Sequence, residues 1–225
     1  MSYVTHQTGF ITLKMIDPSM GQAGCIRDIL EDKEGGFFVE CGALDGETRS
    51  NTLYFERFLN WKGLLVEADP ENFKLVLAKN RKAWLAPTCL SLKRKPSIVN
   101  FYQASNLGKI MGSEEETDSV KFVKVLCIPF TTLLLATGVK RIDYFSLDVE
   151  GNELDVLKTI DFSRFDIRTL SVEYLHDKEG KNAIRNFMEE AGYSVHSVIV
   201  RRLNRANDFI FIKNGPYSFN KNKCH

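Results

Sequence analysis

The chain has 225 residues, of which 44% are hydrophobic and 26% are charged, a composition typical of a globular protein with one α/β domain or two small ones. The formal net charge of +1 gives no electrostatic reason to expect a nucleic-acid partner. Short basic runs at 79–82, 93–95 and 200–205 are expected to be solvated surface. No window approaches the ~20 apolar residues of a membrane span. A membrane anchor could still lie in a part of the protein that this sequence does not include.

The five cysteines are odd in number and include no C-x-x-C pair, so we expect no zinc site, and we assign no metal-binding residues. Cys41, Cys89 and Cys127 fall within or at the ends of predicted strands, where a free thiol behaves as a small apolar residue. There is also no N-x-[ST] sequon. Together these features favour a cytosolic or unglycosylated chain.

The first half of the chain begins with an irregular head over residues 1–35, in which a short helix is expected near 21–31. Apolar runs predict buried strands at 36–43, 63–69 and 84–91. Helices are expected at 50–60 and from Pro70 to about Asn80. The Asp69-Pro70 pair is typical of an N-cap followed by proline in the first turn.

The second half predicts an insert followed by further strands and helices. Segments 97–103 and 121–130 alternate well enough for antiparallel strands or a hairpin-like insert, with a mobile polar loop at 106–119 between them. Pro129 begins a helix closed by Gly138. The remaining expected elements are a strand at 142–151, a helix at 152–159, a strand at 167–175, a helix at 180–191 and two closely connected strands at 193–202 and 208–214.

Strands that alternate with helices, most of them continuous buried runs, predict a parallel sheet covered on both faces. The last two strands have no helix between them, so the final strand should run antiparallel. We expect one α/β domain at 36–215, with a head at 1–35 and a tail at 216–225.

Carboxylates gather where the predicted strands end. Parallel sheets bind ligands outside the carboxyl ends of their strands. The acids at these ends are Glu40, Asp45, Glu67, Asp69, Asp148, Glu150 and Glu173. We therefore expect a binding site at this edge of the sheet.

The charges of these acids narrow the class of ligand that the site can bind. Glu67 follows Gly46 by about 20 residues, the spacing from which an acid binds the hydroxyls of an adenosine ribose. A nicotinamide dinucleotide would use the same acid, but its pyrophosphate would be repelled by Glu40, Asp45 and Glu47, and the third glycine of G-x-G-x-x-G is missing. S-adenosylmethionine, with an ammonium and a sulfonium, suits the acids better.

Three segments resemble a known family. "FFVECGALDGE" at 37–47, "GLLVEADPENF" at 63–73 and "IDYFSLDVEGNELDVLK" at 142–158 are similar to FkbM-type (Methyltransf_21) class I S-adenosylmethionine-dependent methyltransferases, a resemblance that covers about 36–213. "DPSMGQ" at 17–22 and "SNTLYFER" at 50–57 look closest to arthropod Star-like proteins. Some of those are membrane-anchored trafficking factors without established chemistry, which would favour an endomembrane location.

The resemblance implies a Rossmann-like, seven-stranded, mostly parallel sheet with the last strand antiparallel, and S-adenosyl-L-methionine as cofactor. The cofactor-binding residues that it implies are Glu40, Gly42, Ala43, Asp45, Gly46, Asn51, Glu67, Ala68, Ser91 and Asp148. For Asn51, a plain role at the start of a helix stays open.

Methylation of a hydroxyl on a small molecule or glycan is the expected reaction, and it needs a group that removes the hydroxyl proton. The candidates are Asp148, Glu150, Glu173 and His176. His176 could equally be a surface loop residue, and Glu150 could stabilise the start of the following helix. Asp148 and Glu173 could instead bind a divalent ion, as in some catechol-type methyltransferases. A non-catalytic module in endomembrane trafficking or protein interaction is the alternative function.

Overall fold

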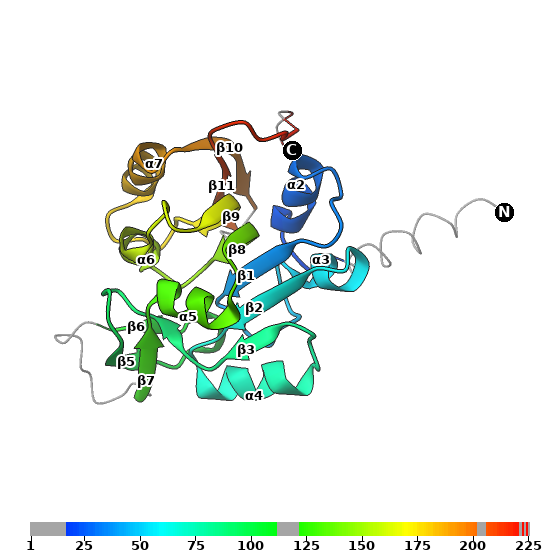
Figure 1. The fold of residues 1–225 in the computed structure, drawn as a ribbon. Helices are drawn as coiled ribbons and strands as arrows, with labels where there is room; N and C mark the ends of the chain where they lie inside the picture. Colours follow the sequence, from blue (N-terminus) through cyan, green and yellow to red (C-terminus); the bar gives the residue numbers. More distant parts are fainter. Residues whose placement is uncertain (1–16, 112–121, 202–205, 221, 223, 225) are drawn as a thin grey trace.

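Strand β1 (Phe37–Cys41) shows why the sheet is covered on both faces (Figure 1). Its residues Phe37, Val39 and Cys41 pack into one apolar cluster, whereas Phe38 packs into a second cluster on the opposite face. The structure is a computed structural model that describes residues 17–111, 122–201, 206–220, 222 and 224. Residues 1–16 of the predicted head and the acidic run at 113–119 of the predicted polar loop lie outside these residues.

The main sheet has seven strands in the order β10-β11-β9-β8-β1-β2-β3. Besides β1 these are β2 (Lys62–Val66), β3 (Trp84–Ala86), β8 (Arg141–Leu147), β9 (Asp166–Glu173), β10 (Tyr193–Val200) and β11 (Asn207–Lys213). β11 runs antiparallel to both β9 and β10, and the pairs joining β9, β8, β1, β2 and β3 are parallel. The predicted fold class is therefore confirmed. The insertion of the last strand between β9 and β10 was not predicted.

Helices cover the two faces of this sheet (Figure 1). Residues of α5 (Phe130–Thr137), α6 (Glu153–Thr159) and α7 (Lys181–Glu190) belong to the apolar cluster on one face. Residues of α2 (Gln22–Ile29), α3 (Leu53–Phe58) and α4 (Pro70–Ala78) belong to the cluster on the other. The Asp69-Pro70 prediction is confirmed, because the Asp69 side chain accepts a hydrogen bond from the Glu71 N–H at the start of α4.

A second, four-stranded sheet corrects two predictions. The run at 84–91 is not one strand, because β3 belongs to the main sheet and β4 (Cys89–Leu90) to the small one. β5 (Ser97–Tyr102) and β7 (Phe122–Ile128) pair antiparallel, as expected of the insert. The predicted loop at 106–119 starts inside regular structure, namely the 3-10 helix η1 (Ser105–Leu107) and β6 (Lys109–Ile110).

Two disulfides overturn the interpretation of the cysteines as free thiols. Cys89 in β4 and Cys127 in β7 are register partners and are bonded to each other, and Cys25 in α2 is bonded to Cys224. Cys41 is free and buried, as expected. Disulfides persist in oxidising compartments, so the cysteines no longer support a cytosolic location.

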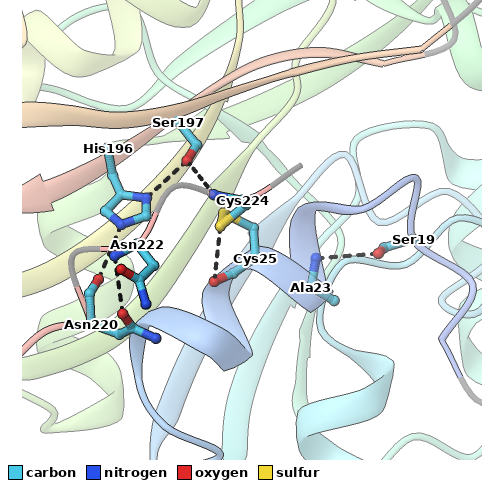
Figure 2. The surroundings of a disulfide bond; sticks show 8 residues. All are labelled: Ser19, Ala23, Cys25, His196, Ser197, Asn220, Asn222 and Cys224. Carbon is cyan, nitrogen blue, oxygen red and sulfur yellow. Dashed lines mark hydrogen bonds between the residues drawn. A yellow bond between two sulfur atoms is a disulfide. The ribbon is translucent and has the colours of Figure 1, made fainter.

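The Cys25–Cys224 bond attaches the end of the chain to the head helix α2 (Figure 2). Around it, the Cys224 N–H donates to Oγ of Ser197 at 3.0 Å, and the Asn220 N–H donates to the Ile29 carbonyl at 3.1 Å. His196 lies beside this contact, with Nδ1 2.9 Å from the same Ser197 Oγ. These contacts hold α2, β10 and the described residues of the tail together.

In the described ranges no helix is long and apolar enough to cross a membrane. The basic run at 79–82 is not all solvated surface, because Arg81 is buried. Among the aromatic side chains in and after the helix expected at 50–60, Phe55 and Trp61 are buried in the core, whereas Phe58 is half exposed.

Candidate functional site

A cavity of about 340 Å³ opens at the carboxyl ends of the parallel strands, where a ligand site was predicted. Its volume lies in the range of small-molecule sites, ~300–1,000 Å³. One wall comes from the ends of β1, β2, β8 and β9, and another from the small sheet. Of the predicted site residues, Glu40, Gly42, Ala43, Asn51, Glu67, Ala68, Asp148, Glu150, Glu173 and His176 line it.

Gly42 allows two strand ends to meet at the cavity. Its φ of +83° is in the left-handed region, and a Cβ at this position would lie 2.0 Å from the carbonyl oxygen of Asp148. The Gly42 N–H donates to the Val66 carbonyl, and the Asp148 N–H donates to the Cys41 carbonyl. The loop after β1 is therefore held between the ends of β2 and β8, and only glycine fits there.

Glu40 is buried and organises the loop that follows β1. Its carboxylate accepts hydrogen bonds from the hydroxyls of Ser50 and Thr52 and from the N–H of Asn51. Burial raises the pKa of Glu40, while nearby Arg81 and these donors act in the opposite direction. Glu40 thus lines the cavity with most of its hydrogen-bonding capacity already used inside the protein.

Asp45 and Gly46, predicted to bind the cofactor, lie outside the cavity lining. The Asp45 carboxylate accepts hydrogen bonds from the N–H groups of Glu47 and Thr48 and from the Thr48 hydroxyl, which closes the turn. These donors lower the pKa of Asp45 although burial acts against them. Ser91 is likewise outside the lining, and its hydroxyl donates to the Lys95 carbonyl at 2.7 Å.

Arg81 is a buried cation that the sequence analysis missed. Its guanidinium donates to Glu56 at 3.0 Å, to the Gly46 carbonyl and to the hydroxyls of Ser50 and Thr52. These bonds hold the loop between β1 and α3 in place. Its burial was not predicted, because Arg81 lies in a short run of basic residues that is typical of solvated surface.

Glu67 follows the end of β2, is buried and lines the cavity. Its Oε2 accepts from the Leu44 N–H at 2.7 Å and its Oε1 from the Asp69 N–H at 2.8 Å. No lysine or arginine of the described chain forms a salt bridge with it. Burial raises the pKa of Glu67 to about 7, against the effect of these backbone donors. Each oxygen keeps lone pairs for further donors.

Two buried acceptors of the cavity wall have no hydrogen-bond partner among the described residues: Oδ1 of Asn51 and Oδ1 of Asp148. The Asn51 amide is fixed in position because its Nδ2 donates to Oγ of Ser146 at 2.9 Å. A buried acceptor without a donor is costly, so these two atoms are available to accept hydrogen bonds from a ligand or a water molecule in the cavity. The Asn51 residue precedes α3 rather than forming its first turn.

Glu150 and His176 come together from the loops after β8 and β9. Nδ1 of His176 lies 2.9 Å from Oε2 of Glu150 and 3.9 Å from Oε2 of Glu173. The loops approach closely at Gly151, whose φ is +103° and where a Cβ would lie 2.6 Å from the His176 carbonyl. Burial, with the charge of Asp148 nearby, raises the pKa of Glu150 to about 8.

Glu150 does not stabilise the start of α6, because it precedes the helix and has a left-handed φ of 57°. Glu153 takes that role: its carboxylate accepts from the Val149 N–H at 2.8 Å and from the Gly151 N–H at 3.0 Å. The sequence analysis missed Glu153, because an acid in the first turn of a helix does not by itself indicate a binding site.

The family model described as "Methyltransferase FkbM domain" matches residues 40–195, more than half of the chain, and spans the cavity loops of β1, β2, β8 and β9. The chain belongs to the FkbM methyltransferase family. This confirms the family resemblance, whereas the particular closeness to Star-like proteins has no support from these matches. No curated protein matches the chain.

Several solved structures are similar to this FkbM family member at low sequence identity. The FkbM methyltransferase of Methylobacillus flagellatus KT is 12% identical with a TM-score of 0.54, and the match covers 80% of this chain but only 44% of that one. Fibrillarin of Aeropyrum pernix, with natively bound S-adenosyl-L-methionine, is 14% identical (TM-score 0.47; 80% and 67% covered). TrmK of M. capricolum, in complex with S-adenosyl-homocysteine, is 10% identical (TM-score 0.46; 91% and 68% covered).

Proposed function

We propose that this chain binds S-adenosyl-L-methionine in the cavity and transfers its methyl group to a hydroxyl of a small molecule or glycan. The observation that carries the proposal is Glu67, a buried carboxylate that lines the cavity and has no salt bridge to a lysine or arginine of the described chain. Such an acid at the end of the second strand suits the two hydroxyls of an adenosine ribose.

The remaining lining fits the rest of the cofactor. Ala68 adjoins Glu67 and offers a small apolar contact for adenine, while Gly42 and Ala43 let the backbone come close to the ligand. The unpartnered Oδ1 atoms of Asn51 and Asp148 can accept hydrogen bonds from an ammonium group. This supports a cationic ligand over a dinucleotide, whose pyrophosphate would meet carboxylates. Cofactor binding by Asp45, Gly46 and Ser91 stays a prediction. Asp45 and Gly46 shape the turn that follows Gly42.

The chemistry asks the protein to position the acceptor, to exclude water and to take up a proton. When bound, the cofactor supplies an electrophilic methyl group. His176 is the best-placed proton acceptor, because Glu150 lies 2.9 Å from its Nδ1 and can hold the ring in one orientation. Asp148 and Glu173 line the same cavity and complete the set of candidate groups.

A thermal-shift experiment tests the cofactor site. S-adenosylmethionine and S-adenosylhomocysteine, each at 100 times its dissociation constant, should stabilise the fold by about 2.7 kcal/mol, and NAD should not. No shift with either sulfur compound at millimolar concentration would contradict the proposal. Transfer of a labelled methyl group to hydroxylated small molecules and glycans then tests turnover.

A non-catalytic Star-like module in endomembrane trafficking or protein interaction is the second candidate. The two disulfides support the endomembrane part of this candidate, because they suit the oxidising interior of the endomembrane system or the cell exterior. Cofactor binding without labelled product from any acceptor, together with intact disulfides in the native protein, would support this candidate over the methyltransferase.

A further inference from the structure

The wall of the cavity contains one cation to which the proposed function gives no role. Among the described residues that line the cavity, Arg49 is the one that carries a permanent positive charge. The amino-acid end of S-adenosylmethionine carries a carboxylate beside its ammonium, and the unpartnered Oδ1 atoms of Asn51 and Asp148 suit only the ammonium. The carboxylate needs a donor or a cation, and Arg49 can provide both.

Arg49 lies close to the two atoms that would accept the ammonium. It belongs to the loop between β1 and α3, and residues 48–51 of this loop all line the cavity. Burial raises the pKa of Asp148 to about 6, and the charge of Arg49 acts in the opposite direction. The ammonium and the carboxylate of an α-amino acid are attached to the same carbon atom, so their protein partners must be neighbours. Arg49 and Asn51, two residues apart, meet this requirement.

The guanidinium of Arg49 is available to a ligand. It forms no hydrogen bond or salt bridge with another residue in the part of the chain that the structure describes. The buried Arg81 differs, because its guanidinium already donates to Glu56 and to groups of the β1–α3 loop. A guanidinium presents five N–H donors in a planar fork that matches the two oxygens of a carboxylate.

The backbone holds Arg49 in a conformation that is unfavourable for an arginine. Its φ of 60° lies in the left-handed region, which residues with a Cβ rarely adopt. The loop is fixed on both sides of it: Arg81 donates to the Gly46 carbonyl and to the Ser50 hydroxyl. The Ser50 N–H also donates to the Glu47 carbonyl at 3.1 Å. Such strain is most common at binding and active sites, so it favours a role for the side chain.

We propose that Arg49 binds the carboxylate at the amino-acid end of the cofactor and so selects adenosine ligands that carry a complete α-amino acid. This inference rests on the proposed function, because it concerns the same cavity. The ammonium would bind Oδ1 of Asn51 or Asp148, and the carboxylate on the same carbon would bind Arg49. Each charge of the zwitterion then meets an opposite charge or a suitable dipole of the protein.

Calorimetric titration with two ligands tests the proposal: S-adenosylhomocysteine and its decarboxylated analogue, which keeps the ammonium. The parent should bind S-adenosylhomocysteine at least about tenfold more tightly, the effect of one charge-assisted hydrogen bond. Arg49→Gln should weaken S-adenosylhomocysteine binding by about tenfold without weakening that of the analogue. Arg49→Lys keeps the charge without the fork and should restore part of the preference. Arg164→Gln, which removes an exposed guanidinium outside the cavity lining, should change neither affinity.

Arg49→Gly is the second variant, chosen because glycine adopts a left-handed backbone without strain. It should weaken S-adenosylhomocysteine binding as Arg49→Gln does, without lowering the melting temperature of the ligand-free protein. An equal preference for S-adenosylhomocysteine over the analogue in the parent and in both variants would overturn the proposal and leave the cofactor site intact. A parent that binds neither compound at millimolar concentration would contradict the proposed function, and this inference with it.

Discussion

The ionisation of Glu67 gives a prediction that can be worked out from the structure. Folding raises the pKa of this acid from 4.5 to about 7, chiefly by burial, with the Asp69 carboxylate adding to the effect. The ligand-free fold therefore loses stability as the pH rises from about 4.5 through about 7, because a buried carboxyl must give up its proton. Ribose hydroxyls donate hydrogen bonds to the ionised carboxylate. A bound ligand should therefore favour the ionised form of Glu67, whereas the ligand-free fold favours the protonated form.

The expected magnitude follows from the ionised fraction. With a pKa of about 7, Glu67 is ionised to about 90% at pH 8 and about 10% at pH 6. If ligand binds only the ionised form, the affinity for S-adenosylhomocysteine should be about tenfold lower at pH 6 than at pH 8. Other carboxylates of the cavity also have raised pKa values, so the share of Glu67 must be isolated with a variant.

Isothermal titration calorimetry of the parent and of Glu67→Gln at pH 6, 7 and 8 isolates the contribution of Glu67 to the pH dependence of binding. At pH 8 the variant should bind S-adenosylhomocysteine roughly 10- to 100-fold more weakly, the loss of one charge-assisted hydrogen bond of about 1.5–3 kcal/mol. Its affinity should also change less with pH than that of the parent. Glu179→Gln, which removes an exposed carboxylate outside the cavity lining, is the control. Equal affinity and equal pH dependence in the parent and Glu67→Gln would refute the ribose assignment.

Two further predictions concern the backbone and the disulfides. Gly42→Ala should lower the free energy of unfolding by more than about 3 kcal/mol and weaken S-adenosylhomocysteine binding, because the new Cβ meets the Asp148 carbonyl. Gly138→Ala, at a similar positive φ but with nothing within 4 Å, should cost about 1–2 kcal/mol and spare binding; equal effects on binding would contradict the account. Cys224→Ser should lower the free energy of unfolding by about 2–4 kcal/mol under non-reducing conditions. Alkylation of the unfolded, unreduced parent should modify Cys41 alone, and labelling of all five cysteines would rule out both disulfides.

The order of helices and strands was predictable because both faces of the sheet are buried. Continuous apolar runs such as that around Phe38 and Val39 mark parallel strands, and acids at their ends mark the binding edge. Capping residues also predicted where a helix begins, as at Asp69-Pro70. The elements that the sequence concealed are those set by tertiary pairing: β3 and β4 are separated by only Pro87 and Thr88 yet join different sheets.

The candidate site was predictable at the level of strand ends but not of individual acids. Glu67 and Asp148 line the cavity, whereas Asp45, equally acidic in the sequence, faces its own turn. The direction of a carboxylate in a loop depends on nearby donors such as the Thr48 N–H. The sequence alone does not indicate which donors the carboxylate will bind. The buried Arg81 and the disulfides depend on contacts between distant segments, for which spacing carries no signal.

A crystal structure of this chain soaked with S-adenosylhomocysteine tests the central claim most directly. The account predicts the ligand in the cavity between the ends of β1, β2 and β8, with both ribose hydroxyls on Glu67 and the ammonium within hydrogen-bond distance of Oδ1 of Asn51 or Asp148. Density elsewhere on the protein, or a cavity that stays empty at saturating ligand, would contradict it.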